Sequence, residues 1–290
     1  MLGQLDIYGR DKVQLAIERL QAYEPEEGYF LAFSGGKDSV VIKALADMAG
    51  VKYDAHYNIT TVDPPELVHF VKTFDDVQID AQTYEDGRRV TMWNLIPKKL
   101  MPPTRIVRYC CQYLKETNGH GRVTVTGVRW AESVNRRKNQ GEMTIFSKSA
   151  AKELDKAGIQ YTQTQRGSVV LNLDNSESRD AMEMCYRTRQ TLINPIIEWE
   201  DSDVWEFIQK YNLPYCKLYD EGYKRLGCIG CPMGSTKHRV SEFERYPKFK
   251  RQYLKAFEKM LNRIIESGDG DKTKWKSAED VYNWWMEFDK

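Results

Sequence analysis

One short segment constrains the fold more than any other part of the chain. Residues 33–39, Phe-Ser-Gly-Gly-Lys-Asp-Ser, follow the apolar run 29–32 and precede apolar residues at helical spacing over 40–46. This order predicts a strand at about 29–33, a glycine turn, and a helix over 38–49. A strand, a glycine turn and a helix in sequence can hold a phosphate group at the helix N-terminus.

The residue types in this turn suit a phosphate. Gly35 and Gly36 allow backbone N–H groups to approach an anion closely. The hydroxyl groups of Ser34 and Ser39 add donors, and Lys37 adds a positive charge. The spacing differs from the Walker pattern, which needs Gly-x-x-x-x-Gly-Lys-Ser/Thr. A Gly-Gly turn without a ligand is the alternative interpretation.

Asp38 is the one residue of the turn that a bare phosphate would repel. It is therefore expected to meet a cation such as Mg²⁺, to meet a ribose, or to cap the helix.

Strands alternate with helices along much of the chain. Further strands are predicted at about 52–59, 123–126 and 192–197, and a further helix over 11–23. Residues 60–70 are predicted to contain a strand end, a turn and the start of a helix. This alternation predicts an α/β fold with a doubly wound, mostly parallel sheet. Ligands of such sheets lie beyond the carboxyl ends of the strands. The turns at 34–39, 61–63 and 127–129 follow strand ends and are expected to converge.

Two segments depart from this alternation. Residues 139–180 are polar and rich in Asn, Ser and Asp, which predicts an insertion or loop within a nucleotide-binding domain over 1–235. Residues 236–290 combine helical spacing with many aromatic residues and are predicted to form a helical C-terminal extension. Aromatic residues at helical spacing favour a core or a partner interface over base stacking.

Charge and hydropathy argue against some classes of protein. Lys and Arg total 43 against 42 Asp and Glu, so no overall basic field indicates nucleic acid. No apolar run approaches the roughly 20 residues that span a bilayer. The first residues are polar and amphipathic, unlike a signal peptide. A cytoplasmic enzyme without a membrane partner is the expectation.

Cysteines form two close pairs, Cys110-Cys111 and Cys228-x-x-Cys231. In a cytosolic chain such pairs suggest metal or redox chemistry more than disulfides. Adjacent cysteines clamp zinc poorly, because their side chains diverge, but they can ligate different irons of one cubane. The spacing favours a [4Fe–4S] cluster over zinc, with a redox-active dithiol third and unmetallated thiols as the remaining alternative.

Several segments together resemble the phosphoadenosine phosphosulfate (PAPS) reductase-like branch of the ATP pyrophosphatase superfamily. Residues 34–39 match its Ser-Gly-Gly-x-Asp-Ser loop at every specified position, which favours the phosphate interpretation over a plain turn. Residues 127–133 resemble its Gly-x-Arg-x-x-Glu-Ser motif, and 194–208 and 213–228 resemble its Trp- and Tyr-rich segments. The resemblance covers about residues 28–235.

The resemblance implies roles for residues at these positions. It implies catalytic roles for Lys37, Asp38 and Arg129. The implied nucleotide ligands are Ser34, Gly35, Gly36, Lys37, Asp38, Ser39, Thr61, Asp63, Gly127, Arg129 and Glu132. The cysteine pairs are similar to the set that holds a [4Fe–4S] cluster in adenylylsulfate reductases, which implies Cys110, Cys111, Cys228 and Cys231 as ligands.

Two departures from the reductases bear on the reaction. Their phosphate loop is degenerate, whereas this loop is intact and similar to that of ATP sulfurylase small subunits and DNA phosphorothioation enzymes, which bind ATP. The reductases also end in a Glu-Cys-Gly-x-His tail, whereas no cysteine follows Cys231 in this sequence. The reductase route then requires Cys185 or Cys216 as a substitute nucleophile.

These features favour an enzyme that splits ATP to AMP and pyrophosphate and adenylates an acceptor for sulfur transfer, with DNA phosphorothioation as the preferred setting. The implied partners are Mg²⁺, a sulfur donor such as a cysteine desulfurase, and DNA or tRNA as the acceptor. Candidate nucleic-acid contacts are Arg136, Arg137, Lys138, Lys237 and Arg239. The alternatives are an adenylylsulfate or phosphoadenylylsulfate reductase that forms sulfite, and a non-catalytic accessory protein; a homodimer is left open.

Overall fold

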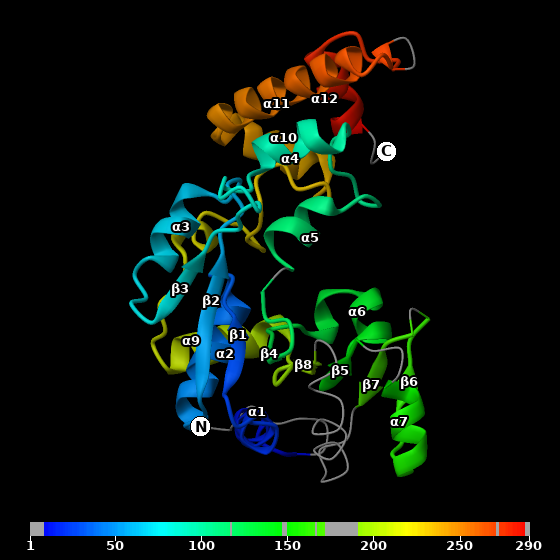
Figure 1. Ribbon diagram of the computed structural model, residues 1–290. Coiled ribbons are helices and arrows are strands. Elements are labelled where there is room, and N and C mark those ends of the chain that lie inside the picture. Colours follow the sequence, from blue (N-terminus) through cyan, green and yellow to red (C-terminus); the bar gives the residue numbers. More distant parts are fainter. Residues whose placement is uncertain are drawn as a thin grey trace. The chain divides into compact units, whose positions relative to one another are not determined.

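The computed structural model describes residues 9–116, 118–146, 150–165, 167–171, 191–270 and 273–287. The chain divides into two compact units, which are described separately (Figure 1). The first unit comprises Met1–Tyr57, His69–Gln78 and Gly119–Lys224. The second unit comprises Asn58–Val68, Ile79–Asn118 and Arg225–Lys290.

A sheet of eight strands has the order β3-β2-β1-β4-β8-β5-β7-β6. The strands are β1 Tyr29–Ala32, β2 Tyr53–Asn58, β3 Val77–Asp80, β4 Val123–Val125, β5 Met143–Ile145, β6 Thr162–Gln163, β7 Val169–Leu171 and β8 Thr191–Ile193. Strand β1 pairs in parallel with β2 and β4, and β4 pairs in parallel with β8. The predicted α/β fold class is confirmed, and so are the strands expected near 29–33, 52–59 and 123–126. The strand expected near 192–197 is shorter and earlier than predicted, because β8 ends at Ile193 and a turn follows it.

The segment predicted as an insertion or loop adds regular structure to this sheet. Within residues 139–180 lie β5, β6, β7 and helix α7, Ala150–Ala157. Strand β5 pairs antiparallel with β8, β7 with β5, and β6 with β7. Strands β5 and β7 are buried along their whole length, so the segment extends the sheet instead of forming a plain loop. Residues 172–180 of this segment lie outside the described residues.

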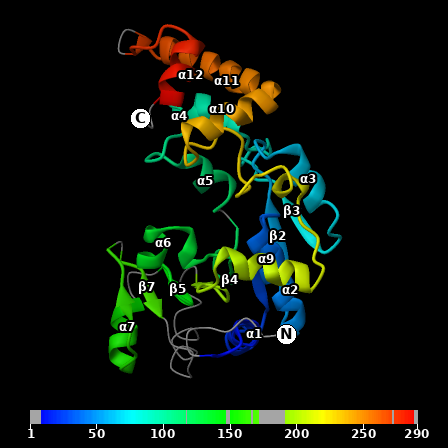
Figure 2. The same ribbon diagram turned by 180° about the vertical axis from the view of Figure 1, so that it is seen from behind.

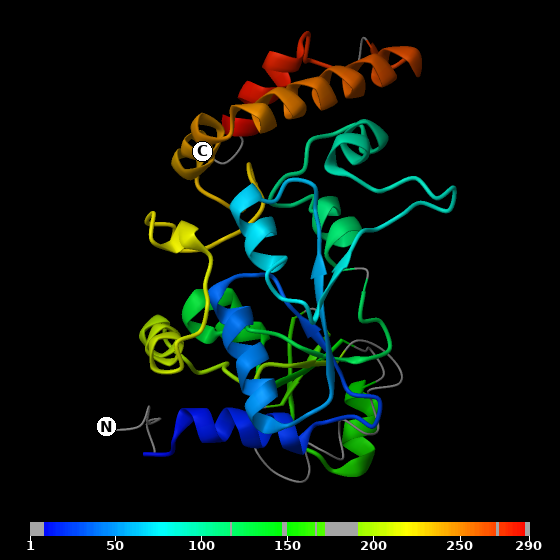
Figure 3. The same cartoon turned by 90° about the vertical axis from the view of Figure 1, so that its left-hand side faces the viewer.

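The helices complete the fold. They are α1 Lys12–Ala22, α2 Lys37–Ala49, α3 Pro65–Val71, α4 Met92–Lys99, α5 Tyr109–Leu114, α6 Val134–Asn139, α9 Asp201–Lys210, α10 Thr236–Arg245, α11 Pro247–Glu266 and α12 Ala278–Glu287, with short 3₁₀ helices at Trp130–Glu132 and Lys217–Tyr219. In the first unit, α2 packs against α1 and α9, as Figures 2 and 3 show. Helix α2 ends at Gly50, whose φ of 67° is readily adopted only by glycine.

The C-terminal helices form the core of the second unit. Helix α11 packs against α4, α10 and α12. The rings of Tyr253 and Trp285 lie 4.8 Å apart at their centroids, and Phe257 packs 5.5 Å from Trp285. These three residues are at most 1% exposed, which confirms a core role for aromatic residues of the predicted helical region. Residues 236–290 share the unit with 58–68, 79–118 and 225–235, and the domain boundary at 235 stays a prediction.

No helix among the described residues combines the length and the apolar composition that crossing a membrane requires.

Candidate active site

The glycine turn after β1 leaves the N-terminus of α2 without a side-chain cap. Gly36 is the N-cap, and Gly35 has φ of 72°, the left-handed region that glycine adopts at little cost. The Ser39 hydroxyl donates to the Gly36 carbonyl at 2.8 Å, and Ser34 Oγ accepts the Gly36 N–H at 3.3 Å. The helix dipole adds partial positive charge here, so this turn suits an anion.

Tyr219, which is not among the predicted site residues, also contacts this turn. Its hydroxyl accepts the Lys37 N–H at 2.9 Å. A Cβ added to Gly36 would lie 3.4 Å from the same hydroxyl. Burial raises the pKa of Tyr219, so the phenol stays protonated and can donate to an anion. Its position in the tyrosine-rich segment 213–228, part of the family resemblance, is the signal that could have indicated it.

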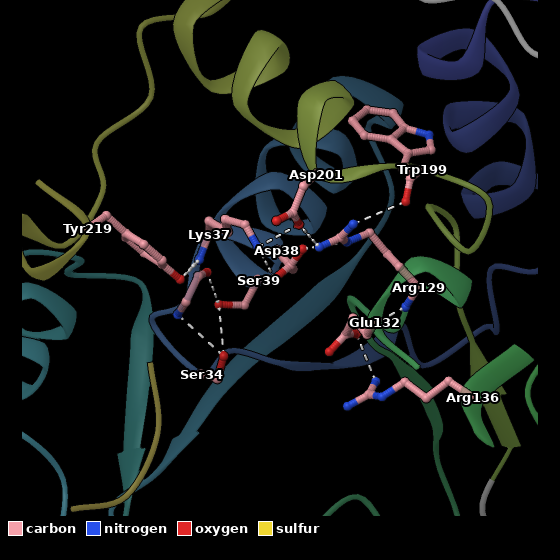
Figure 4. A network of polar contacts seen from close by, with 11 residues as sticks. Ser34, Lys37, Asp38, Ser39, Arg129, Glu132, Arg136, Trp199, Asp201 and Tyr219 are labelled. Atoms are coloured by element: carbon pink, nitrogen blue, oxygen red, sulfur yellow. Dashed lines mark hydrogen bonds and ion pairs between the residues drawn. The ribbon is translucent and has the colours of Figure 1, made fainter. Parts of the chain in front are cut away.

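Two cations and two carboxylates form a network beside the turn (Figure 4). Arg129 donates from Nε to Asp38 Oδ1 at 2.6 Å and from Nη2 to Asp201 Oδ1 at 2.5 Å. Lys37 Nζ lies 3.3 Å from Asp38 Oδ2 and 3.2 Å from Asp201 Oδ1. The side chains of Lys37 and Arg129 are 6% and 2% exposed, whereas that of Asp201 is 67% exposed. Asp201 is thus the surface member of a mostly buried set of charges.

Arg129 is engaged at all three guanidinium nitrogens, because Nη1 donates to the Trp199 carbonyl at 3.1 Å. A phosphate contact of Arg129 would use the second N–H of Nη1 or Nη2, or would replace one of these protein acceptors. Partial burial opposes ionisation of Asp201, but the Arg129 hydrogen bond and the charge of Lys37 outweigh it and hold its pKa below the ordinary value. Asp201 therefore stays ionised at neutral pH.

Gly127 brings the chain after β4 into close contact with α2. A Cβ at this position would lie 2.9 Å from the Cβ of Asp38 and 3.0 Å from its carbonyl carbon. Any side chain at position 127 would displace the Asp38 backbone, so glycine is the residue that fits there. Gly127 therefore positions Asp38 beside Arg129 by close packing.

We expect Gly127→Ala to lower the free energy of unfolding by about 1–3 kcal/mol, because the added methyl group overlaps the backbone of a packed helix. Denaturant unfolding measures this change. Gly227→Ala is the matched control, since a Cβ there meets nothing within 4 Å. If both variants unfold at the wild-type midpoint, the inference that Gly127 packs closely against Asp38 is wrong.

Glu132 supports the backbone of the same segment. Its Oε1 accepts the Arg129 N–H at 3.2 Å and pairs with Arg136 at 3.0 Å. Its implied role as a nucleotide ligand stays a prediction. Arg137 and Lys138 lie exposed on α6, where they remain available to a polyanion.

Thr61 and Asp63, predicted to line the nucleotide, belong to the second unit. Thr61 has φ of 69°, and its hydroxyl oxygen accepts the Met92 N–H at 3.1 Å. The Asp63 carboxylate accepts from the Thr60 N–H at 2.6 Å and from the Thr60 hydroxyl at 2.7 Å. Within this unit both side chains hold a tight turn, and their role toward a nucleotide stays a prediction.

The four paired cysteines all belong to the second unit and are all half-buried. Cys110 and Cys111 lie in the first turn of α5, and the Cys231 N–H donates to the Cys228 carbonyl at 3.1 Å. The hydrogen bond from Cys110 and the guanidinium of Arg108, whose Nη2 lies 3.4 Å from Cys111 Sγ, lower the pKa of Cys111 to about 5. Cys111 is therefore the member of its pair that is readily deprotonated.

Positive charge also lies near the second cysteine pair. Lys115 interacts electrostatically and by a hydrogen bond with Cys228, a contact that the sequence analysis did not anticipate. Thr60 Oγ1 lies 3.4 Å from Cys228 Sγ. Burial nevertheless raises the pKa of Cys228 to about 11. The charge of Lys115 does not offset the effect of burial on the Cys228 thiol. A bound metal would therefore have to supply the further positive charge that displaces the thiol proton.

The donor set of these cysteines bears on the kind of metal group that fits. Among the described residues, no three His, Cys, Asp or Glu side chains are placed to hold one metal ion. The four thiols nevertheless lie near enough for Cys110 to interact electrostatically with Cys228 and Cys231. An all-sulfur donor set has the ligand chemistry of an iron–sulfur cluster, and the cluster itself stays a prediction.

One expected nucleic-acid contact is wrong. Arg239 is 0% exposed, its guanidinium carbon lies 4.2 Å from the centre of the Trp285 ring, and it donates to the Trp285 carbonyl at 3.1 Å. The residue is part of the core between α10 and α12, because the face of α10 that carries it is buried. Lys237, two positions earlier, is exposed and stays a candidate.

One of the two substitute nucleophiles, Cys216, lies among the described residues. Cys216 is 1% exposed in the first unit, and a thiol in such a site is a poor nucleophile. Cys185 lies outside the described residues.

Comparisons with known proteins agree with the resemblance seen in the sequence. An uncharacterized protein of Methanocaldococcus jannaschii is 26% identical over 237 residues, which cover 77% of this chain and 46% of that protein. The adenosine 5'-phosphosulfate reductase of Oceanobacillus iheyensis is 47% identical over 45 residues, 16% of this chain and 19% of that protein. The chain thus matches less than half the length of each of these two relatives.

Solved structures and a family model complete the comparison. The phosphoadenylyl-sulfate reductase of Candida auris, in a phosphate complex, is 13% identical, with a TM-score of 0.41 over 79% of this chain and 98% of that one. The FMN adenylyltransferase of Candida glabrata, with FAD and pyrophosphate, is 14% identical, with a TM-score of 0.41 over 76% and 63%. Residues 28–233 match the model of the phosphoadenosine phosphosulfate reductase domain, and the chain belongs to that family.

Proposed function

We propose that the chain is an enzyme of sulfur metabolism that splits ATP into AMP and pyrophosphate and adenylates an acceptor for sulfur transfer. The observation that carries this proposal is the intact glycine turn at the N-terminus of α2, where buried Lys37 and Arg129 lie beside Asp38. A site that only binds a nucleotide does not need two buried cations next to a carboxylate.

The reaction is a displacement at the α-phosphorus. An acceptor oxygen forms a bond to that phosphorus, and the bond to the bridging oxygen breaks, so that pyrophosphate leaves with the electron pair. Lys37, the turn amides and the Ser34 and Ser39 hydroxyls stabilise the charge that develops on the pyrophosphate. Mg²⁺ carried by the nucleotide would be held by Asp38, whose carboxylate is 24% exposed, and would neutralise part of that charge.

The cysteine pairs extend the proposal to a [4Fe–4S] cluster held by Cys110, Cys111, Cys228 and Cys231. Such a cluster supplies electron transfer or structural stability when bound, and Arg108 and Lys115 offset its negative charge. A sulfur donor such as a cysteine desulfurase, and DNA or tRNA as the acceptor, complete the proposed reaction. Exposed Lys237, Arg137 and Lys138 are the proposed phosphate contacts.

A second candidate is the reduction of adenylylsulfate or phosphoadenylylsulfate to sulfite. The names of relatives such as the Oceanobacillus iheyensis reductase favour it. The reaction needs a reactive thiol that attacks the sulfate sulfur, and the burial of Cys216 argues against that residue. A third candidate, a nucleotide-binding accessory protein, would bind ATP without releasing pyrophosphate.

Parallel turnover assays separate these candidates. Anaerobically purified protein is offered ATP–Mg²⁺, with plasmid DNA or tRNA as acceptor, or adenylylsulfate with a thiol reductant. We expect pyrophosphate from ATP and no sulfite from adenylylsulfate. Sulfite without pyrophosphate would replace the proposal by the reductase, and tight ATP binding with neither product would favour the accessory protein.

A further inference from the structure

Asp201 has a position in the charge network that the proposed reaction does not yet explain. Its Oδ1 contacts both buried cations, at 2.5 Å from Arg129 Nη2 and 3.2 Å from Lys37 Nζ. The other acceptors of Arg129 are Asp38 and the carbonyl of fully buried Trp199. Asp201 is 67% exposed, so it is the acceptor that an incoming ligand can replace most easily.

Buried cations require a counter-charge whether or not a ligand is present. An unpaired charge in a mostly buried site is strongly destabilising, so Lys37 and Arg129 need an anionic partner in the empty protein. Asp38 alone would have to serve two cations. Asp201 supplies the second negative charge and makes the network neutral.

The start of α9 does not depend on Asp201. The Glu200 N–H donates to Asp203 Oδ2 at 2.8 Å, and Asp203 also pairs with Lys12. As the first residue of α9, Asp201 gains only a small contribution from the helix dipole. Its carboxylate is therefore available to hold the cations and to leave them.

We propose that Asp201 is an internal counter-anion that holds Lys37 and Arg129 in the empty protein and is displaced by the pyrophosphate group of an incoming nucleotide. This inference rests on the proposed nucleotide site and adds a specificity function to it. A polyphosphate carries enough negative charge to replace a carboxylate on both cations, whereas a neutral nucleoside or a single weak anion does not. Asp201 thereby favours ligands that carry enough negative charge to compete with its carboxylate for both cations.

The test compares wild-type protein with Asp201→Asn and with Glu206→Gln. Asparagine keeps the size of the side chain and an oxygen acceptor for Arg129, but it removes the competing charge. Glu206 is exposed on the same helix, so its substitution by glutamine makes the same change in net charge away from the network. The probes are inorganic pyrophosphate in EDTA, ATP–Mg²⁺ and adenylylsulfate, measured by anaerobic calorimetry with thermal unfolding as a check of folding.

We expect Asp201→Asn to bind pyrophosphate about tenfold more tightly than wild type, within the usual range of coupling between two competing interactions. Glu206→Gln should bind within about twofold of wild type, as for a distant surface charge. A merely structural role of Asp201 would weaken binding or leave it unchanged, and either result overturns the inference. Equal tightening in both variants also overturns it, since net charge would then be the cause.

Failure of this inference is distinguishable from failure of the proposed function. If wild type binds pyrophosphate or adenylylsulfate but releases no pyrophosphate from ATP, the proposed function fails, and the comparison of Asp201→Asn with wild type still decides the role of Asp201. If none of the probes binds to wild type or to Asp201→Asn, the anion site itself is wrong, and the inference falls with it.

Discussion

Lys37→Ala is expected to lower pyrophosphate release from ATP by at least about 10²-fold, because it removes a preorganised positive charge from the place where the leaving group becomes negative. The lysine side chain is only 6% exposed, so water cannot take over its role efficiently. Pyrophosphate release at saturating ATP measures the effect, and a chelator assay measures bound iron. Iron content should not change, since the four paired cysteines belong to the other unit.

Lys43→Ala is the matched control for this substitution. Lys43 lies farther along the same helix, its side chain is 10% exposed, and it pairs with Asp76 at 2.6 Å and Asp47 at 3.3 Å. Its replacement should lower stability through the loss of those pairs while turnover of the folded protein persists. Loss of turnover in both lysine variants, or loss of iron together with turnover in Lys37→Ala, would mean that misfolding explains the result.

Local patterns in the sequence were sufficient to predict the turn that positions Lys37. Glycines at 35 and 36, an apolar run before them and helical spacing after them act over a few residues, and β1 and α2 form where those signals lie. The parallel pairing of β1 with β2 and β4 follows from the alternation of strands with helices. The local conformations that these patterns predict are retained in the folded protein, because tertiary packing favours the same conformations.

Contacts between distant residues could not be predicted in the same way. Arg129 and Asp201 are 72 residues apart in the sequence, and Lys37 and Tyr219 are 182 apart. Nothing local marks Asp201 as the partner of buried cations, since an acidic residue in the first turn of a helix is ordinary. Arg239 was misassigned for the converse reason: basic neighbours in the sequence suggested a surface, whereas the aromatic face of Trp285 shields its guanidinium.

The antiparallel strands of the insertion were missed because of their length. Strands β5 and β7 contain three residues each, and β6 contains two. Segments this short carry almost no periodic signal. Their strand conformation depends on pairing with β8, which the sequence places nearly fifty residues from β5.

Cys228→Ser is expected to remove most of the bound iron and the brown colour of anaerobically purified protein. A serine hydroxyl is a poor ligand for iron at neutral pH, and the loss of one of four thiolates exposes the cluster to solvent and to oxygen. Lys115 would then lack the sulfur with which it interacts. The broad thiolate-to-iron absorbance and a chelator assay for iron measure the outcome.

Cys216→Ser separates this effect from a general sensitivity of the protein to cysteine substitution. Cys216 is 1% exposed and belongs to the first unit, so its replacement places a hydroxyl in a buried site and should lower stability without changing the iron content. If Cys228→Ser keeps the wild-type absorbance, the four cysteines do not hold an iron–sulfur cluster, whatever ATP turnover shows. If it loses iron while still releasing pyrophosphate from ATP, the cluster serves a step after adenylation, because activation of the acceptor then proceeds without it.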